Sequence, residues 1–261
     1  MRIRNSTFSV LLPLAFILFS LSARAQETST DDLKKEVETL NQNMNAMQRD
    51  LQEIKALLQN RARVSPPRSV VLNLDKRPVK GEGTAKLTLV EFLDYQCPYC
   101  GQFSRETMPQ IERDYIETGK VRYVVVNLPL EAMHKSAFKA AEASACAGEQ
   151  GKFWEMHERL FNNQQILDQW KTHAEAIGLD VNQFLQCMDT GRQAAQVRSD
   201  IAEAREAGVS GTPAFFLAYT DPKSATIKTV TKLVGSQPYA SFKAAIDKEL
   251  AEKLEVAAAK E

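Results

Sequence analysis

The chain has 261 residues with 33 basic and 33 acidic side chains, so its formal net charge at pH 7 is zero. That balance gives no indication of a nucleic acid or an anionic lipid surface as a partner. Its four cysteines comprise one Cys-x-x-Cys pair, Cys97 and Cys100, and two isolated residues, Cys146 and Cys187.

Residues 1–25 have the pattern of a secretory signal peptide. A basic start precedes the apolar stretch 8–21, and Ala23 and Ala25 form a small-residue cleavage site. The apolar stretch is short for a membrane span, and an uncleaved N-terminal anchor is the alternative. Cleavage leaves 30 basic residues against 33 acidic ones. We therefore expect an exported protein, with the periplasm as its compartment, where disulfides can form.

We interpret residues 26–63 as a coiled-coil oligomerisation helix. Apolar side chains recur alternately four and three residues apart over four heptads, which is the period of a coiled-coil seam. The seam comprises Leu33, Val37, Leu40, Met44, Met47, Leu51, Ile54 and Leu58. Residues 31–60 are therefore predicted to join two or three copies of the chain. The alternative is a single amphipathic helix folded against the domain that follows it in the same chain.

A linker is predicted at 64–80. Ser65-Pro66-Pro67 cannot continue the preceding helix, and the surrounding residues are polar and rich in turn formers. Val70–Leu74 is a candidate edge strand within it. A catalytic domain over 81–261 follows.

The catalytic domain opens with an apolar strand, Leu87–Leu93, that runs into Cys97-Pro98-Tyr99-Cys100. A helix is predicted from about Pro98 to Glu117. This places the sulfur of Cys97 at a helix N-terminus, where unpaired backbone N–H groups and the helix dipole favour the thiolate. Cysteines in such positions are nucleophiles at neutral pH, and Cys100 lies one turn on, where it can resolve a mixed disulfide.

Other interpretations of this Cys-x-x-Cys pair are weaker. A structural zinc site needs two more ligands, and the sequence has no second Cys-x-x-Cys. Attachment of a c-type haem needs His after Cys100, and position 101 is Gly. A purely structural disulfide is possible, but a two-residue loop at a helix start suits exchange better. We therefore expect redox chemistry without a metal or organic cofactor.

In the rest of the domain, a long helical segment separates one predicted strand from two later ones. Val121–Leu128 is a β-branched strand, and about 80 residues of helical character then intervene, over about 130–210, before strands near 214–219 and 227–234. Ser236 and Pro238 begin a final helix. The candidate helices of the intervening segment are 134–147, 152–161, 164–177, 181–188 and 191–207. The fold class is α/β.

These features resemble a known family. The run Leu87–Gly101 is similar to the active-site strand and helix of thioredoxin-fold proteins, above all the DsbA-type disulfide oxidoreductases. Gly211-Thr212-Pro213 resembles their cis-proline loop, and 150–154 resembles part of their helical insertion. The resemblance covers about 79–250 and implies a thioredoxin fold with an inserted helical domain, preceded here by the coiled-coil helix.

The resemblance also implies roles for individual residues. Thr212 and Pro213 would form the edge on which a client peptide docks. Pro98 and Tyr99 would tune the redox potential. DsbA itself carries His after that Pro, whose charge stabilises the thiolate, so Tyr99 puts the most oxidising potentials in doubt.

Glu91 lies six residues before Cys97. The family has a buried acidic residue there, beneath the disulfide, that serves proton transfer. Because Val90 and Phe92 flank it in what should be a central strand, we predict burial. The alternative is a solvated carboxylate on an outward strand face.

Cys146 and Cys187 both fall in the predicted insertion. We favour a second, structural disulfide between them, because unpaired thiols are uncommon in exported proteins. The alternative is two separate buried thiols that pack as small apolar residues. His134, His157 and His173 also fall there, remote in sequence from Cys97, and are interpreted as surface or packing residues rather than ligands.

The sequence thus predicts an exported, oligomeric enzyme that exchanges disulfides with exported client proteins and is recycled by a membrane redox partner. The heptads favour a multidomain isomerase or reductase, whereas the DsbA-like domain favours net oxidation. A chaperone or binding protein with an incidental disulfide is a third interpretation.

Overall fold

The computed structural model describes residues 30–54 and 69–258, and the chain divides into two units, residues 1–66 and 67–261. The predicted signal peptide and the last predicted heptad position, Leu58, lie outside the described residues. Each unit is therefore described by itself.

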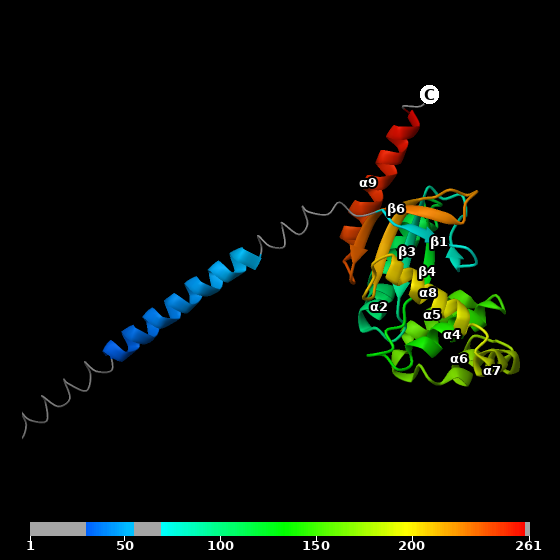
Figure 1. Cartoon of the computed structure of the whole chain (residues 1–261), viewed down its shortest axis with the longest axis horizontal. Helices are drawn as coiled ribbons and strands as arrows, with labels where there is room; N and C mark the ends of the chain where they lie inside the picture. Colours follow the sequence, from blue (N-terminus) through cyan, green and yellow to red (C-terminus); the bar gives the residue numbers. More distant parts are fainter. Residues whose placement is uncertain (1–29, 55–68, 259–261) are drawn as a thin grey trace, which may run out of the picture. The chain divides into compact units, whose positions relative to one another are not determined.

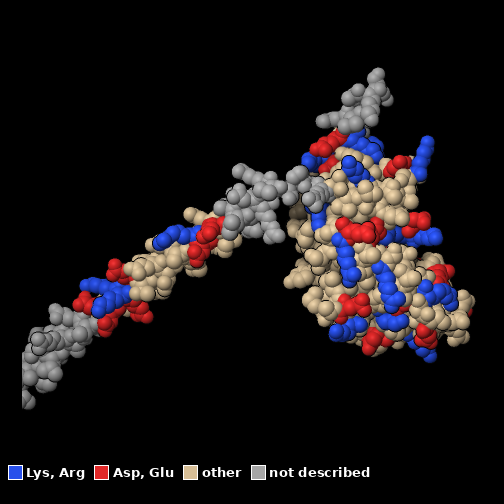
Figure 2. Space-filling view, viewed as in Figure 1, with Lys and Arg blue, Asp and Glu red and all other residues tan. Residues whose placement is uncertain are grey.

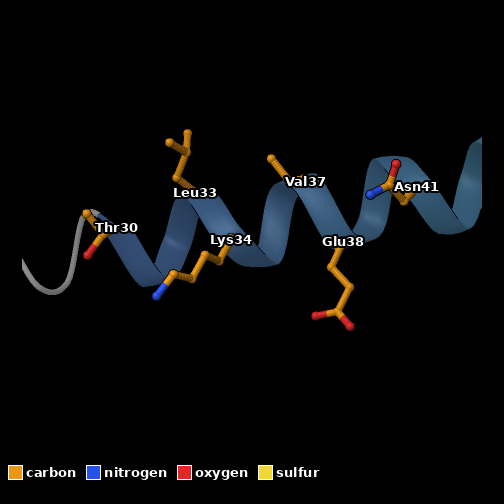
Figure 3. Close-up of a pocket in the computed structure, with 6 residues that line it drawn as sticks. All are labelled: Thr30, Leu33, Lys34, Val37, Glu38 and Asn41. Carbon is orange, nitrogen blue, oxygen red and sulfur yellow. The ribbon is translucent and has the colours of Figure 1, made fainter.

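The described part of the first unit is a helix over 30–54. Its seven seam residues from Leu33 to Ile54 are each between 50% and 63% exposed. Figure 3 shows the start of this seam, with Leu33 and Val37 on one side of the helix and Lys34 and Glu38 on the other. The helix therefore presents one continuous apolar stripe. Its pairing into a coiled coil remains a prediction.

A six-stranded sheet forms the centre of the second unit, in the order β1-β6-β5-β3-β4-β2. The strands are β1 (Val71–Asn73), β2 (Val79–Lys80), β3 (Leu87–Leu93), β4 (Val121–Asn127), β5 (Ala214–Tyr219) and β6 (Thr226–Val234). β3 runs parallel to β4 and antiparallel to β5. All seven residues of β3 are buried, because hydrophobic clusters cover both faces of this central strand.

The two short edge strands lie inside the segment predicted as a linker. β1 pairs with β6 and β2 pairs with β4, both antiparallel. β1 lies within Val70–Leu74, the candidate edge strand of the sequence analysis. β2 is not predicted, because two residues are too few to give a periodic pattern. The sheet therefore begins before residue 81.

The predicted helix after Cys97 is helical from Pro98 to Ile116, but it is not a uniform α-helix. Two π-helical turns, Phe103–Thr107 and Glu112–Ile116, alternate with α2 (Pro98–Gln102) and α3 (Met108–Ile111). Pro109 has no N–H to donate to the preceding turn, which fits the widening just before it.

The segment between β4 and β5 is a helical insertion. Figure 1 shows most of it at one end of the sheet, away from the C-terminal helix α9 (Tyr239–Ala258), whereas its last helix packs against β4. Its helices are α4 (Ala137–Gly148), α5 (Phe153–Asn162), α6 (Trp170–Ala176), α7 (Val181–Thr190) and α8 (Ala194–Glu206). The predicted helix 164–177 is instead a 3-10 turn, Gln164–Ile166, followed by α6, and Leu167 between them is buried. Acidic and basic side chains are interspersed on the face of this unit drawn in Figure 2.

Candidate active site

Cys97 and Cys100 lie where the central strand gives way to a helix. β3 ends at Leu93, and Cys97 is the N-cap residue of α2, with Pro98 in its first turn. Both cysteines are free thiols, and Cys97 is 4% exposed whereas Cys100 is completely buried. Cys97 therefore keeps a small solvent-exposed surface, whereas Cys100 has none.

Asp94 organises the turn between strand and helix. One carboxylate oxygen accepts a hydrogen bond from Gln96 N (2.7 Å), and the backbone carbonyl accepts one from Cys97 N (3.1 Å). Its second carboxylate oxygen accepts from His134 Nδ1 (2.7 Å) and Leu130 N (2.8 Å). This buried carboxylate thus fastens the start of the insertion to the turn that carries Cys97.

The surroundings of Cys97 favour its thiolate. A hydrogen bond from Cys100 is the largest cause that lowers the pKa of Cys97, to about 5, although burial opposes it. The side chain of Thr212 and the backbone N–H groups of Cys100 and Tyr99 lower this pKa further. The backbone N–H groups of the helix N-terminus therefore add to a stabilisation whose largest part comes from the Cys100 thiol.

Cys100 behaves in the opposite way. Burial is the largest cause that raises its pKa well above the usual value, and the hydrogen bond to Cys97 and the charge of Glu91 add to the shift. The two thiols of one helical turn are therefore strongly unequal as acids.

Glu91 is buried, on the same central strand, and is 1% exposed. Burial raises the pKa of Glu91 to about 8, while a hydrogen bond from Tyr123 lowers it and the charge of Cys97 raises it. Tyr123 Oη donates to one carboxylate oxygen, and the other oxygen has no partner among the described residues. A carboxyl in this setting can hold a proton at neutral pH.

The loop before β5 faces the cysteines. Its Thr212–Pro213 peptide bond is cis, and Cys97 Sγ donates a hydrogen bond to Thr212 O at 3.4 Å. Pro98 is exposed, and Tyr99 is 63% exposed beside the reactive sulfur. The structure therefore brings together all the residues that the resemblance assigned to the site.

Cys146 and Cys187 form a disulfide, with an S–S distance of 1.98 Å and a Cα–Cα distance of 5.9 Å. The bond joins α4 to α7 within the insertion and is buried. The residues from 30 to 54 and from 69 to 258 contain no group of three or more His, Cys, Asp or Glu side chains arranged to hold a metal ion.

Several contacts in and around the site are not predicted from the sequence. His134 is remote from Cys97 along the chain but bonds to Asp94, and His157 Nδ1 lies 3.0 Å from Tyr95 Oη in an aromatic cluster. His173 is buried and donates to a backbone carbonyl. No sequence pattern marks such long-range partners.

A family comparison agrees with this geometry. A sequence model for a family described as thioredoxin matches residues 73–248. The chain belongs to this thioredoxin family.

Two solved structures are similar to this chain in fold and sequence. It is 25% identical to alpha-DsbA1 of Wolbachia pipientis, with a TM-score of 0.62, over 70% of this chain and 95% of that one. BdbD of Bacillus subtilis, in its oxidised form, gives 26% identity and a TM-score of 0.61 over 72% and 100%. The predicted DsbA-like thioredoxin fold, preceded by an N-terminal helix, is confirmed.

Curated relatives in sequence are named as Na(+)/H(+) antiporters. The chain is 38% identical over 150 residues to the Na(+)/H(+) antiporter NhaA 3 of Salinispora tropica. That match covers 57% of this chain and only 22% of the antiporter. Within the part of the chain that the structure describes, no helix has the length and apolar character needed to cross a membrane.

Proposed function

We propose that the protein is an exported thiol–disulfide oxidoreductase that forms or rearranges disulfide bonds in exported proteins through Cys97 and Cys100. The observation that carries this proposal is the contrast in acidity between the two thiols of one helical turn: the pKa of Cys97 is lowered to about 5, whereas that of Cys100 is raised. Exchange needs one sulfur that attacks and leaves as a thiolate, and a second that resolves.

In the oxidising direction, a client thiolate attacks Cys97 Sγ of the Cys97–Cys100 disulfide. A mixed disulfide forms between client and Cys97, and Cys100 leaves with the electron pair of the broken bond. A second client thiolate then attacks the client sulfur and expels Cys97 as a thiolate. The client gains one disulfide, and the enzyme is left as a dithiol. The low pKa of Cys97 makes it the better leaving group in this second step.

Glu91 serves the proton balance of the first step. Cys100 leaves into a buried site where its thiolate is disfavoured, so it needs a proton. Glu91 is protonated at neutral pH, and it lies close enough to Cys100 that its carboxylate, once ionised, raises the pKa of that thiol. It can therefore give this proton when Cys100 leaves and accept it back when Cys100 attacks a mixed disulfide.

The client would lie along the loop that faces Cys97. Thr212 O lies 3.4 Å from the reactive sulfur, so an extended client strand that pairs with the Thr212 backbone would bring its own sulfur to Cys97. A membrane redox partner would return the dithiol to the disulfide, or the reverse. Export itself rests on the signal-peptide pattern of residues 1–25.

The helix over 30–54 would join two or three copies through its exposed seam. Several catalytic domains around one client would favour isomerisation, because each holds the client at a high local concentration. A lone DsbA-like domain would suffice for net oxidation. The direction of flow therefore depends on the assembly.

Disruption of the seam in the full chain separates these activities. A variant with Leu40, Met44 and Met47 changed to Lys should be monomeric in solution. The matched control changes Thr39, Gln42 and Asn45 to Lys, which adds the same charge on the other side of the helix. If the seam variant loses reactivation of scrambled ribonuclease but still oxidises reduced ribonuclease, the assembly makes the protein an isomerase. If the seam variant and the control both oxidise and neither reactivates, the protein is an oxidase.

The remaining interpretation is a chaperone or binding protein whose cysteines are incidental. It predicts that a Cys97→Ser/Cys100→Ser variant keeps its biological role. Loss of that role in a strain lacking other disulfide-forming enzymes would refute the binding interpretation.

A further inference from the structure

Gln164, in the 3-10 turn of the helical insertion, reaches into the turn that carries the reactive cysteine. Its side-chain Nε2 donates to two backbone carbonyls, Tyr95 O and Cys97 O, both at 2.9 Å. The carbonyl of Cys97 also accepts from Gly101 N at 3.1 Å, which is the first bond of the active-site helix. One side chain from the insertion therefore holds two carbonyls of the turn.

Gly101 leaves room for this contact. It is buried, and a Cβ atom there would come within 2.8 Å of Gln164 Cδ and within 2.9 Å of Arg105 Nη1. The nearest atom to such a Cβ is the amide oxygen of Gln164. Because this is the end of a flexible side chain, a residue with a Cβ at 101 would displace Gln164 rather than break the helix. The glycine after Cys100 and the glutamine 63 positions later thus form one feature.

This contact bears on the chemistry of Cys97. Backbone N–H groups of Tyr99 and Cys100 lower the pKa of that sulfur, and their direction is set by the turn that Gln164 holds. The Gln164 amide also places its N–H groups, the positive end of its dipole, beside the carbonyl of Cys97. The opposite side of the turn is already held by Asp94. Without Gln164, the Tyr95 and Cys97 carbonyls would lose this side-chain donor.

We infer that Gln164 is a positioning residue that stabilises the Cys97 thiolate through the Tyr95 and Cys97 carbonyls, and that Gly101 is required to admit it. This inference rests on the proposed function and deepens it. It assigns to the helical insertion a direct part in the redox poise of the site. Because Gln164 is only half-buried, its loss exposes two carbonyls to water and leaves no closed cavity, so the fold should survive.

The test is a double-mutant cycle on the full chain, with Gln164→Ala, Gly101→Ala and the double variant. Gln110→Ala is the matched control, because Gln110 Nε2 also donates to a carbonyl, Glu106 O, but away from the turn. The readouts are the thiolate absorbance of Cys97 against pH and the equilibrium of the dithiol–disulfide pair with glutathione.

Gln164→Ala should raise the titration midpoint of Cys97 and make the disulfide harder to reduce, by about two- to tenfold in the equilibrium constant, the range of one or two hydrogen bonds. Gly101→Ala should shift both readouts in the same direction, and the two shifts should not add in the double variant, because both changes remove the Gln164 contact. Gln110→Ala should match the wild type.

Gln164→Glu provides a second test should Gly101→Ala fail to fold. It keeps the shape of the side chain but replaces the donor with a carboxylate, and it should shift both readouts further in the same direction. Wild-type values in folded Gln164→Ala and Gln164→Glu, or additive effects in the double variant, would overturn the inference. A wild-type protein that does not equilibrate with glutathione would instead overturn the proposed function.

Discussion

Replacement of Glu91 by Gln should remove a pH dependence from the stability of the oxidised protein. Burial is the largest cause that raises the pKa of Glu91 to about 8 from its ordinary value of 4.5, and burial does not depend on the state of the cysteines. In the oxidised protein neither Cys97 nor Cys100 titrates. Glu91 is then the buried group of the site whose ionisation opposes folding.

The direction follows from the sign of the shift. Because the folded pKa is raised, the folded state binds more protons than the unfolded state between pH 4.5 and pH 8, so stability falls as the pH rises through this window. Below the window the unfolded carboxyl is protonated too, and the penalty vanishes. With 1.36 kcal/mol for each pKa unit, the loss between pH 5 and pH 7.5 is about 3 kcal/mol.

The measurement is urea unfolding of the oxidised wild type and Glu91→Gln at pH 5 and pH 7.5. The difference between the two pH values matters, because any packing change caused by the amide is independent of pH and cancels. The wild type should lose about 3 kcal/mol more than the variant over this interval. Equal losses would mean that Glu91 is ionised in the folded protein at neutral pH, and would remove it as the proton donor for Cys100.

Three further outcomes are expected. Tyr123→Phe removes the hydrogen bond that lowers the pKa of Glu91, so the pH profile of mixed-disulfide resolution should move to higher pH. In thiolate absorbance titrations, Cys100→Ala should raise the midpoint of Cys97 above its value of about 5 by one unit or more, and Cys100→Ser, which keeps a donor, should raise it less. Loss of the second disulfide through Cys187→Ser should cost about 4 kcal/mol of unfolding free energy, from the 41-residue separation that it closes, measured with urea.

Local patterns suffice to predict the central part of the fold. Leu87–Leu93 is apolar on both faces because β3 is covered on both faces, and its bounds agree with the prediction. The position of Cys97 at a helix start follows from the same reading. The insertion is visible as a long helical interval between two strands. These features depend on neighbours in the sequence.

The contacts that adjust the chemistry are of another kind. His134 lies 40 residues from Asp94, and Gln164 lies 67 residues from Cys97. Each is a polar residue whose partner is set by how the insertion folds back on the sheet, so no spacing rule reaches it. Tyr123 is an intermediate case: it lies on a predicted strand, but β-propensity alone explains an aromatic residue there. Only the register with β3 brings it to Glu91.

Oxidation and isomerisation would both begin at Cys97. The catalytic domain alone therefore does not determine the net direction of disulfide exchange. With a pKa of about 5, only about one Cys97 in a hundred keeps its proton at pH 7. The reduced protein is then ready to attack a client disulfide, and the oxidised protein has in Cys97 a leaving group that readily gives its disulfide away. The acidity of Cys97 therefore favours fast exchange in either direction. Under the proposed function, net flow would then be set outside this turn. It would depend on a partner that keeps Cys97–Cys100 mostly oxidised or mostly reduced, and on the number of such domains that the seam of the N-terminal helix would hold around one client.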